Sequence, residues 1–176
     1  AAQLGQAFGV PTSATARGGD IHYWGEQPAT KPMIVAASKR MSGMIAVSQA
    51  LRRDMITLGM DGDSIEVVCP GIDRDLFYPR DARALKQELG VTGQLAVTVG
   101  SLDENKGQYL VQEALRELSD VPDLHYWIAG EGPFRPKLVE KIASFGLNDR
   151  VRLLGNVDRL QVAKLMAAAD IMVMPS

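Results

Sequence analysis

The sequence is poor in the residue types that define several functional classes. Its 176 residues include one cysteine, Cys69, and two histidines, His22 and His125. A single cysteine excludes an internal disulfide and fits a reducing compartment, and its apolar neighbours predict an inert core thiol. The histidines are expected in packing or surface roles, with His125 inside a buried strand. Because the acidic residues are scattered along the chain, we expect no metal site.

Long apolar runs and an excess of basic charge are also missing. No stretch approaches the roughly 20 apolar residues that a membrane-spanning helix needs. The 19 basic and 21 acidic residues give a net charge of −2 without a basic stripe, so nucleic acid is not an expected partner. No Ser/His/Asp arrangement or nucleophile elbow is present, and the glycines after Val99 do not form the GxGxxG pattern of NAD-binding folds.

What the chain does have is a 46% share of hydrophobic residues in alternating strand and helix patterns. Continuous apolar strands that alternate with amphipathic helices are typical of an α/β fold, with a parallel sheet covered on both faces. The second half predicts strands at Leu95–Gly100, Leu124–Gly130, Val151–Gly155 and Ile171–Met174. The first half predicts strands at Val10–Ala16, Met44–Ser48 and Ser64–Cys69, and helices at Pro32–Met41 and Gln49–Leu58.

Helix boundaries and faces can be placed from the same patterns. Ser48, Asp81 and Asp158 each precede a helical pattern and are expected to be N-caps. In the helix after Gly107, the predicted core face consists of Leu110, Val111, Ala114, Leu115 and Leu118. At the start, Ala1–Gly9 reads as the end of a helix, there is no initiator methionine, and the chain stops just after its last strand. We therefore expect a fragment of a longer polypeptide.

The strand ends are the places to look for ligand chemistry, because open parallel sheets bind ligands beyond the carboxyl ends of their strands. Lys106 comes just before a helix N-terminus at that edge. Its ammonium would reinforce the partial positive charge of the free amides and help to hold a diphosphate. The alternative is a solvated turn lysine that is countered by Asp103 and Glu104.

Three more turns have both a functional and an ordinary interpretation. The glycine loop Gly130–Gly132 permits close approach of a ligand, but it is also common turn chemistry, and Glu131 is often only a solvated acid. The segment Gly155-Asn156-Val157 could present backbone groups to a flat base, or it could be a plain loop. Arg17 and Asp20 flank two glycines and could bind a polar acceptor or pair with each other.

The order of several motifs along almost the whole chain resembles one known family. The motifs are the turn Arg17–Asp20, the strand and helix Ile45–Leu51 with Leu58-Gly59, the connector Val67–Asp73 with Phe77–Pro79, Val99–Leu102 with Lys106-Gly107, Ile128–Pro133, Val151–Gly155, and Ala169–Ile171 with Pro175-Ser176. This series resembles the retaining glycosyltransferases of the GT-B class known as family 4, or glycosyl transferases group 1.

The resemblance implies two Rossmann-like parallel-sheet halves of a GT-B fold, both incomplete in this chain. Residues 1–75 would be the C-terminal part of the acceptor-side domain, 76–92 the connector and first helix, and 93–176 the N-terminal part of the donor-binding domain. The implied reaction moves a sugar, with retention of configuration, from a nucleotide diphosphate sugar to a glycan or lipid-linked acceptor. The implied reaction uses no cofactor or metal, because cationic side chains and helix N-termini neutralise the leaving diphosphate.

The resemblance also assigns site residues. It places Gly71, Gly100, Ser101 and Lys106 at the donor diphosphate, Gly155, Asn156 and Val157 at the nucleobase, Gly130, Glu131 and Gly132 in a glycine loop, and Arg17 and Asp20 on the acceptor side. The family commonly has arginine at the Ser101 position and histidine at the Arg17 position. The acidic pair that holds the donor sugar is expected beyond Ser176, so the catalytic residues stay unknown and the segment alone is expected to be inactive.

Other classes remain open at this point. They are a non-catalytic module that binds nucleotide diphosphates, an epimerase or phosphorylase of the same fold, and a pure interaction domain. We expect a cytoplasmic location; peripheral contact with the inner membrane surface also stays open, although Lys39, Arg40, Arg52 and Arg53 are better explained as solvated helix faces. The sequence does not indicate the donor sugar, the base, the acceptor or the oligomeric state.

Overall fold

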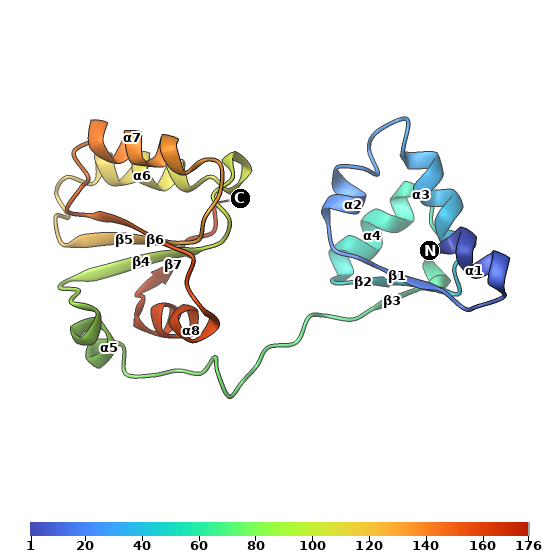
Figure 1. Cartoon of the computed structure of the whole chain (residues 1–176), viewed down its shortest axis with the longest axis horizontal. Coiled ribbons are helices and arrows are strands. Elements are labelled where there is room, and N and C mark those ends of the chain that lie inside the picture. Colours follow the sequence, from blue (N-terminus) through green and yellow to red (C-terminus); the bar gives the residue numbers. More distant parts are fainter. Residues whose placement is uncertain (176) are drawn as a thin grey trace. The chain divides into compact units, whose positions relative to one another are not determined.

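A computed structural model describes residues 1–175, which form two compact units. The first unit is Ala1–Ile72 and the second begins at Asp73. Each unit is built on its own parallel sheet (Figure 1). The expected α/β class with two parallel sheets is therefore confirmed.

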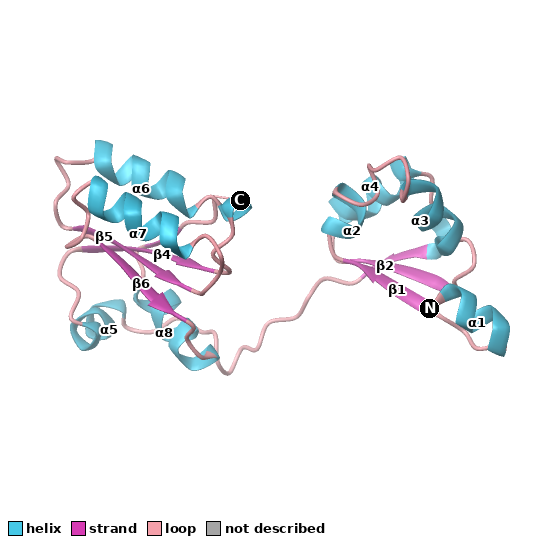
Figure 2. Ribbon diagram, turned by 45° about the horizontal axis from the view of Figure 1, so that its top comes forward, coloured by secondary structure: helices cyan, strands magenta, loops and turns pink. Residues whose placement is uncertain are grey.

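In the first unit, three parallel strands lie in the order β1-β2-β3. Helices α2, α3 and α4 lie on the same side of this sheet (Figure 2). Their apolar side chains pack on it through a core that includes Met44, Met55 and Ile65. The elements are α1 (Ala2–Phe8), β1 (Ser13–Ala16), α2 (Gly19–His22), α3 (Lys31–Ser38), β2 (Gly43–Ala46), α4 (Gln49–Leu58), the 3-10 turn η1 (Gly62–Ser64) and β3 (Ile65–Val67).

In the second unit, four parallel strands lie in the order β6-β5-β4-β7. Helices α6 and α7 cover one face of this sheet, and α5 and α8 cover the other (Figure 1). The elements are α5 (Ala82–Leu89), β4 (Gln94–Val99), the 3-10 turn η2 (Glu104–Lys106), α6 (Gln108–Glu117), β5 (Leu124–Ala129), α7 (Arg135–Ser144), β6 (Val151–Gly155), α8 (Arg159–Ala168) and β7 (Ile171–Met172).

Strand β5 shows why this sheet must be covered on both sides. Its successive side chains point to opposite faces, as in any strand. Tyr126 and Ile128 belong to the core beneath α6 and α7, whereas Trp127 and Ala129 belong to the core on the α5 and α8 side. The near-continuous apolar sequence of the strand therefore fills two cores at once.

The predicted N-caps are confirmed. The Ser48 hydroxyl accepts a hydrogen bond from the N–H of Leu51 at 3.1 Å. Asp81 accepts from two amides at the start of α5. Asp158 forms a capping box with Gln161 at the start of α8.

The sequence places several strand boundaries and one thiol incorrectly; β2 ends at Ala46 and β7 at Met172, two residues earlier than predicted. Strand β1 starts at Ser13 and not at Val10, because the N–H of Val10 donates to the carbonyl of Gly5 at 2.9 Å and closes α1. Strand β3 ends at Val67. Cys69 beyond it is exposed, so the prediction of a core thiol is wrong. His125 is half-buried in β5.

The predicted core face of α6 is also partly wrong. Leu115 is buried as expected, but Leu110 and Leu118 are 45% and 40% exposed. The positions that face the interior are instead occupied by Gln108 and Gln112, which are both fully buried. Two polar residues therefore take core positions that an apolar pattern cannot reveal.

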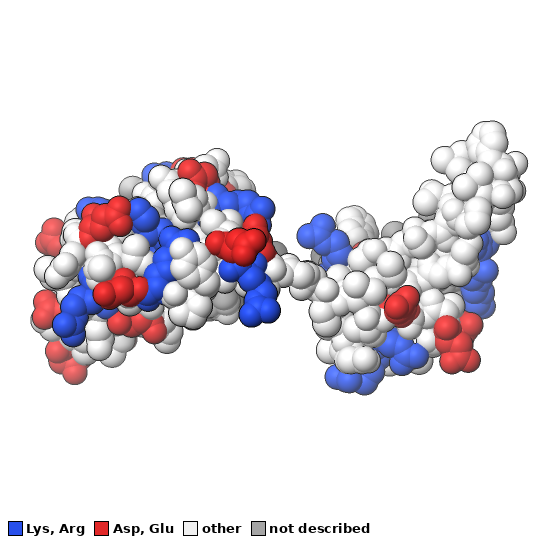
Figure 3. Space-filling model, turned by 90° about the horizontal axis from the view of Figure 1, so that it is seen from below, with Lys and Arg blue, Asp and Glu red and all other residues white. Residues whose placement is uncertain are grey.

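Charge is mixed on one face of the second unit. The face drawn in Figure 3 shows basic and acidic side chains interspersed on it. In the described part of the chain, no helix combines the length and the apolar character needed to cross a bilayer.

Candidate functional site

The strand order of the second unit locates its ligand-binding edge. From β4 the chain adds β5 and β6 on one side, and it then returns to place β7 on the other side of β4. The carboxyl ends of β4 and β7 therefore form a topological switch point, which is where open α/β sheets bind ligands. The segment Gly100–Gly107 follows β4 and Pro175 follows β7, so both lie at this edge.

Glycines hold the strand ends of β4, β5 and β6 together. The N–H of Gly100 donates to Ala129 at 2.9 Å, and the N–H of Gly130 donates to the carbonyl of Gly155 at 2.8 Å. A Cβ on Gly130 would lie 1.9 Å from the carbonyl oxygen of Gly100, and the φ of Gly130 is 145°. Only glycine allows these two backbones to come so close.

The next two contacts extend this edge to β7. A Cβ on Gly132 would meet the backbone of Leu102 at 2.4 Å. A Cβ on Gly107 would meet the carbonyl oxygen of Pro175 at 3.0 Å. The loops after all four strands are therefore in mutual contact, and we call this set of residues (100–107, 130–134, 155–157 and 175) the strand-end rim.

The N-terminus of α6 lies within the strand-end rim and has no side-chain cap. Its N-cap is Gly107, in contrast to Ser48, Asp81 and Asp158 at α4, α5 and α8. The first amides of α6 are therefore free of a capping side chain and carry the partial positive end of the helix dipole. Lys106 is half-buried in η2, directly before this helix start.

Lys106 forms no ion pair with the two acids that precede it in the sequence. Among residues 1–175, no carboxylate lies within ion-pair distance of its ammonium, and neither Asp103 nor Glu104 pairs with it. The rim therefore combines a free ammonium with an uncapped helix N-terminus. Ser101 is exposed at the same edge.

Glu131 makes a contact that sequence reasoning missed. Its Oε1 accepts from Nη1 of Arg135 at 2.9 Å, and the same oxygen would lie 3.1 Å from a Cβ on Gly155. The carboxylate thus reaches from the β5 loop to the β6 loop. The four-residue spacing of Glu131 and Arg135 could have indicated the ion pair, but not its place beside Gly155.

Gln108 is a residue beside the rim that the sequence does not predict. Its Nε2 donates to the carbonyl oxygen of Ser101 at 2.9 Å, from the first position of α6. The side chain is fully buried. The signal available in the sequence was a glutamine directly after Lys106-Gly107.

A buried network beneath the rim fixes the end of β7. The hydroxyls of Thr98 and Tyr126 lie 2.7 Å apart, and Thr98 Oγ1 also donates to the carbonyl of Val173 at 2.6 Å. Burial raises the pKa of Tyr126 to about 12, because the interior disfavours the phenolate, although the hydrogen bond with Thr98 acts the other way. Val173 also donates its N–H to Val97.

The start of β7 is fixed by a carboxylate. Asp170 accepts a hydrogen bond from the N–H of Leu95 at 2.7 Å and forms an ion pair with Lys86. Desolvation raises the pKa of Asp170, but the hydrogen bonds from Lys86 and Leu95 outweigh it and hold the pKa below its ordinary value.

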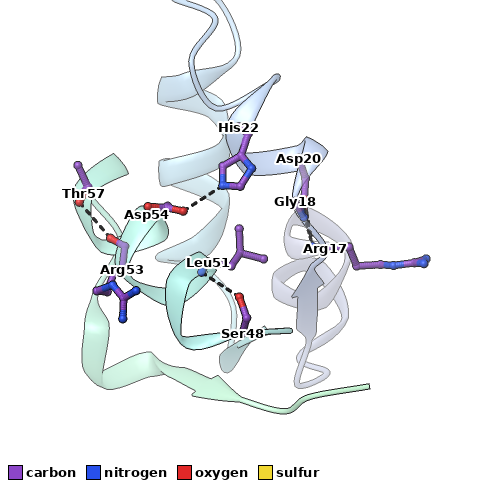
Figure 4. A network of polar contacts seen from close by, with 9 residues as sticks. All are labelled: Arg17, Gly18, Asp20, His22, Ser48, Leu51, Arg53, Asp54 and Thr57. Carbon is purple, nitrogen blue, oxygen red and sulfur yellow. Dashed lines mark hydrogen bonds and ion pairs between the residues drawn. The ribbon is translucent and has the colours of Figure 1, made fainter. Parts of the chain in front are cut away.

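The predicted acceptor-side pair does not form an ion pair. Asp20 Oδ1 accepts from the backbone N–H groups of Arg17 and Gly18, at 3.1 and 2.8 Å. The side chain of Arg17 points away from Asp20 (Figure 4). In the same view His22 pairs with Asp54, with Nε2 and Oδ2 3.0 Å apart. Asp20 is therefore held by the turn itself, and the guanidinium of Arg17 stays exposed.

A cavity of 430 Å³ lies beside this turn in the first unit. Asp20 and Trp24 line it together with apolar side chains, among them those of Met33, Met44 and Met60. Gly71 also belongs to the first unit and is exposed, so its predicted place at the diphosphate stays a prediction.

Two expectations concern metals and the last residue. Within residues 1–175, no three His, Cys, Asp or Glu side chains come together closely enough to hold a metal ion. Ser176, the end of the expected Pro-Ser element, lies outside the described residues.

The fold and the rim define an α/β protein with two parallel sheets, one of which places Lys106 and an uncapped helix N-terminus at its switch point. The family model described as glycosyl transferases group 1 matches residues 66–176. The chain therefore belongs to the glycosyl transferases group 1 family.

Curated relatives agree with this assignment. The chain is 26% identical over 175 residues to the N-acetyl-alpha-D-glucosaminyl L-malate synthase of Bacillus anthracis, covering 98% of this chain and 45% of that protein. It is 31% identical over 156 residues to the D-inositol 3-phosphate glycosyltransferase of Xylanimonas cellulosilytica, covering 81% of this chain and 36% of that protein. The chain thus spans less than half the length of these relatives.

Solved structures show the same arrangement of elements. Anabaena HepE, crystallised in complex with UDP-glucose, superimposes with a TM-score of 0.84 and 25% identity, covering 99% of this chain and 49% of that one. The sucrose-phosphate synthase of Thermosynechococcus elongatus gives the same TM-score at 21% identity, which supports the fold alone.

Proposed function

We propose that this chain is part of a glycosyltransferase that takes a sugar from a nucleotide diphosphate sugar and transfers it, with retention of configuration, to a glycan or lipid-linked acceptor. The observation that carries the proposal is the juxtaposition of Lys106 and the uncapped N-terminus of α6 at the switch point of the second sheet. The similarity to HepE, which binds UDP-glucose in its crystal structure, supports the same class of donor for this chain.

The positive charge in the rim fits the leaving group of such a reaction. When the sugar–oxygen bond breaks, negative charge accumulates on the diphosphate. The ammonium of Lys106 and the first amides of α6 would stabilise that charge. The family's usual arginine is Ser101 here, so Lys106 would supply more of this stabilisation.

Other parts of the rim would hold the rest of the donor. Gly155, Asn156 and Val157 would lie at the base, and the glycine loop Gly130–Gly132 would let the ligand approach the backbone. The acceptor would bind to the first unit, where Asp20 lines a cavity and is held by two backbone amides. The hydroxyl group of the acceptor would attack the sugar on the face from which the diphosphate departs. The acids that hold the donor sugar would come from outside this segment.

Calorimetric titration of the 176-residue chain with UDP tests the donor half of this proposal. Lys106→Ala removes one charge-assisted contact, which is worth about 1.5–3 kcal/mol, and it should weaken UDP binding roughly 10- to 100-fold. The matched control is Lys164→Ala, because Lys164 pairs with Glu88 on the opposite face of the sheet and carries the same charge. This control should bind UDP as the unaltered chain does.

Two results would count against the proposal. Equal UDP affinity in the unaltered chain and in Lys106→Ala would remove Lys106 from the site. An equal loss in both lysine variants would show that net charge matters and position does not.

A further inference from the structure

We propose that Gln108 is a positioning residue of the diphosphate site, whose buried carboxamide holds the carbonyl of Ser101 away from the bound anion. This inference rests on the proposed function and adds to it a residue that makes no contact with the ligand. It follows from the hydrogen bonds of one peptide group in the rim.

The peptide group between Ser101 and Leu102 is fixed on both sides. Its carbonyl oxygen accepts from Gln108 Nε2 at 2.9 Å, and its N–H donates to the carbonyl of Glu131 at 3.0 Å. The carbonyl of Leu102 in turn accepts from the N–H of Phe134 at 2.9 Å. Gln108 thus ties the loop after β4 to the start of α6, and the loop after β5 holds the other edge of the same peptide.

The orientation of this peptide affects an anion site directly. A carbonyl oxygen carries a partial negative charge, and this one lies between the end of β4 and the start of α6. While Gln108 donates to it, the oxygen is satisfied and turned toward the carboxamide. Without that donor, it would compete with a phosphate for the ammonium of Lys106 and for the free amides of α6, or repel the phosphate.

The burial of Gln108 is hard to explain by packing alone. The side chain is fully buried, and within the described part of the chain its Oε1 has no hydrogen-bond partner. An unsatisfied buried carboxamide oxygen destabilises a fold, whereas an apolar side chain of similar size would not. A glutamine at this position is therefore better explained by what its Nε2 holds in place.

The same helix offers a matched control. Gln112 lies one turn further along α6, is also fully buried and also has an unpartnered Oε1 among residues 1–175. Its Nε2 donates to Leu138 in α7, at the longer distance of 3.4 Å, and not to the rim. The two glutamines differ mainly in the carbonyl group to which they donate, Ser101 in the rim for Gln108 and Leu138 in α7 for Gln112.

The test compares Gln108→Leu with Gln112→Leu in the 176-residue chain, using UDP titration and amide hydrogen exchange. Gln108→Leu should weaken UDP binding about tenfold, because the released carbonyl of Ser101 would compete with the phosphate, whereas Gln112→Leu should leave UDP binding unchanged. The amide of Leu102 should exchange faster in Gln108→Leu only. When Lys106→Ala is already present, Gln108→Leu should lower the UDP affinity by a smaller factor, because both substitutions act on one site.

Gln108→Glu keeps the shape of the side chain and serves if the leucine variant does not fold. Its neutral carboxyl group can still donate to Ser101, but its carboxylate cannot, so its UDP affinity relative to the unaltered chain should fall as pH rises. Equal UDP binding by the two leucine variants, or a flat pH profile for Gln108→Glu, would overturn the inference while Lys106-dependent binding stands. Failure of the unaltered chain to bind UDP would overturn the proposed function and this inference together.

Discussion

The carbonyl oxygen of Gly100 lies 1.9 Å from the position that a Cβ on Gly130 would occupy. The two residues directly follow neighbouring strands, β4 and β5, and the closeness of their backbones brings the loops of the rim together. The contact is with backbone, so no side-chain movement could relieve a clash.

Gly130→Ala should therefore destabilise the second unit. The clash and the unfavourable φ of 145° at this residue add up to an expected loss of about 2–5 kcal/mol in the free energy of unfolding. Chemical denaturation measures this loss. Gly146→Ala is the control, because Gly146 also has a positive φ, 66°, but no atom lies within 4 Å of its Cβ position. A loss no larger than in this control would contradict the close packing of the two strand ends.

The raised pKa of Tyr126 leads us to expect a loss of stability at high pH. Its folded-state pKa is about 12, whereas the phenol of an unfolded chain titrates near about 10. Above pH of about 10 the unfolded state loses a proton that the folded state retains, so unfolding becomes more favourable as pH rises. The stability difference between the unaltered chain and Tyr126→Phe should therefore shift by about 2–3 kcal/mol in favour of the phenylalanine variant between pH of about 9 and about 12.

Denaturation curves at several pH values check this prediction. Tyr126→Phe should itself be less stable by about 1 kcal/mol at neutral pH, because it loses the hydrogen bond with Thr98. Parallel pH dependence of the two proteins would show that Tyr126 is not the titrating group.

The lowered pKa of Asp170 leads us to expect a loss of stability at low pH. Its folded-state pKa is lowered, so its contribution is present above the unfolded value of about 3.9 and is lost as pH falls below it. Asp170→Asn should cost less than about 1 kcal/mol near neutral pH, because the side chain is partly exposed and still accepts from Leu95. Asp170→Ala should cost more, because it leaves that amide without its acceptor.

Acid titration followed by circular dichroism distinguishes the charge from the hydrogen bond. The gap in stability between the unaltered chain and Asp170→Asn should stay constant down to about pH 4 and narrow as pH falls further. A gap that stays constant at lower pH as well would assign the effect to geometry and not to ionisation.

Much of the fold could be predicted from local chemistry. The capping role of a residue depends only on its own short, oxygen-bearing side chain and on the helical pattern that follows it. This holds for the N-caps Ser48, Asp81 and Asp158. The strands can likewise be predicted from their runs of apolar residues. Local patterns sufficed for the order of elements because the alternation of strand and helix fixes a parallel sheet.

The parts that could not be predicted depend on long-range packing. Periodicity predicts the wrong buried face for α6, because Gln108 and Gln112 occupy buried positions that it assigns only to apolar residues. The contact of Gly107 with Pro175 depends on the pairing of β7 with β4. In that pairing Ala96 lies opposite Ile171, which is 75 residues further along the chain. No local pattern encodes such a neighbour.

We propose that the loops after β4, β5 and β6 form one site for a nucleotide diphosphate. The most direct test is a titration of the nitrogen-15-labelled chain with UDP, followed by amide chemical shifts. We expect chemical-shift changes concentrated in residues 100–108, 130–132 and 155–157, and their loss in Lys106→Ala. Shifts that cluster elsewhere, or that persist unchanged in Lys106→Ala, would contradict it.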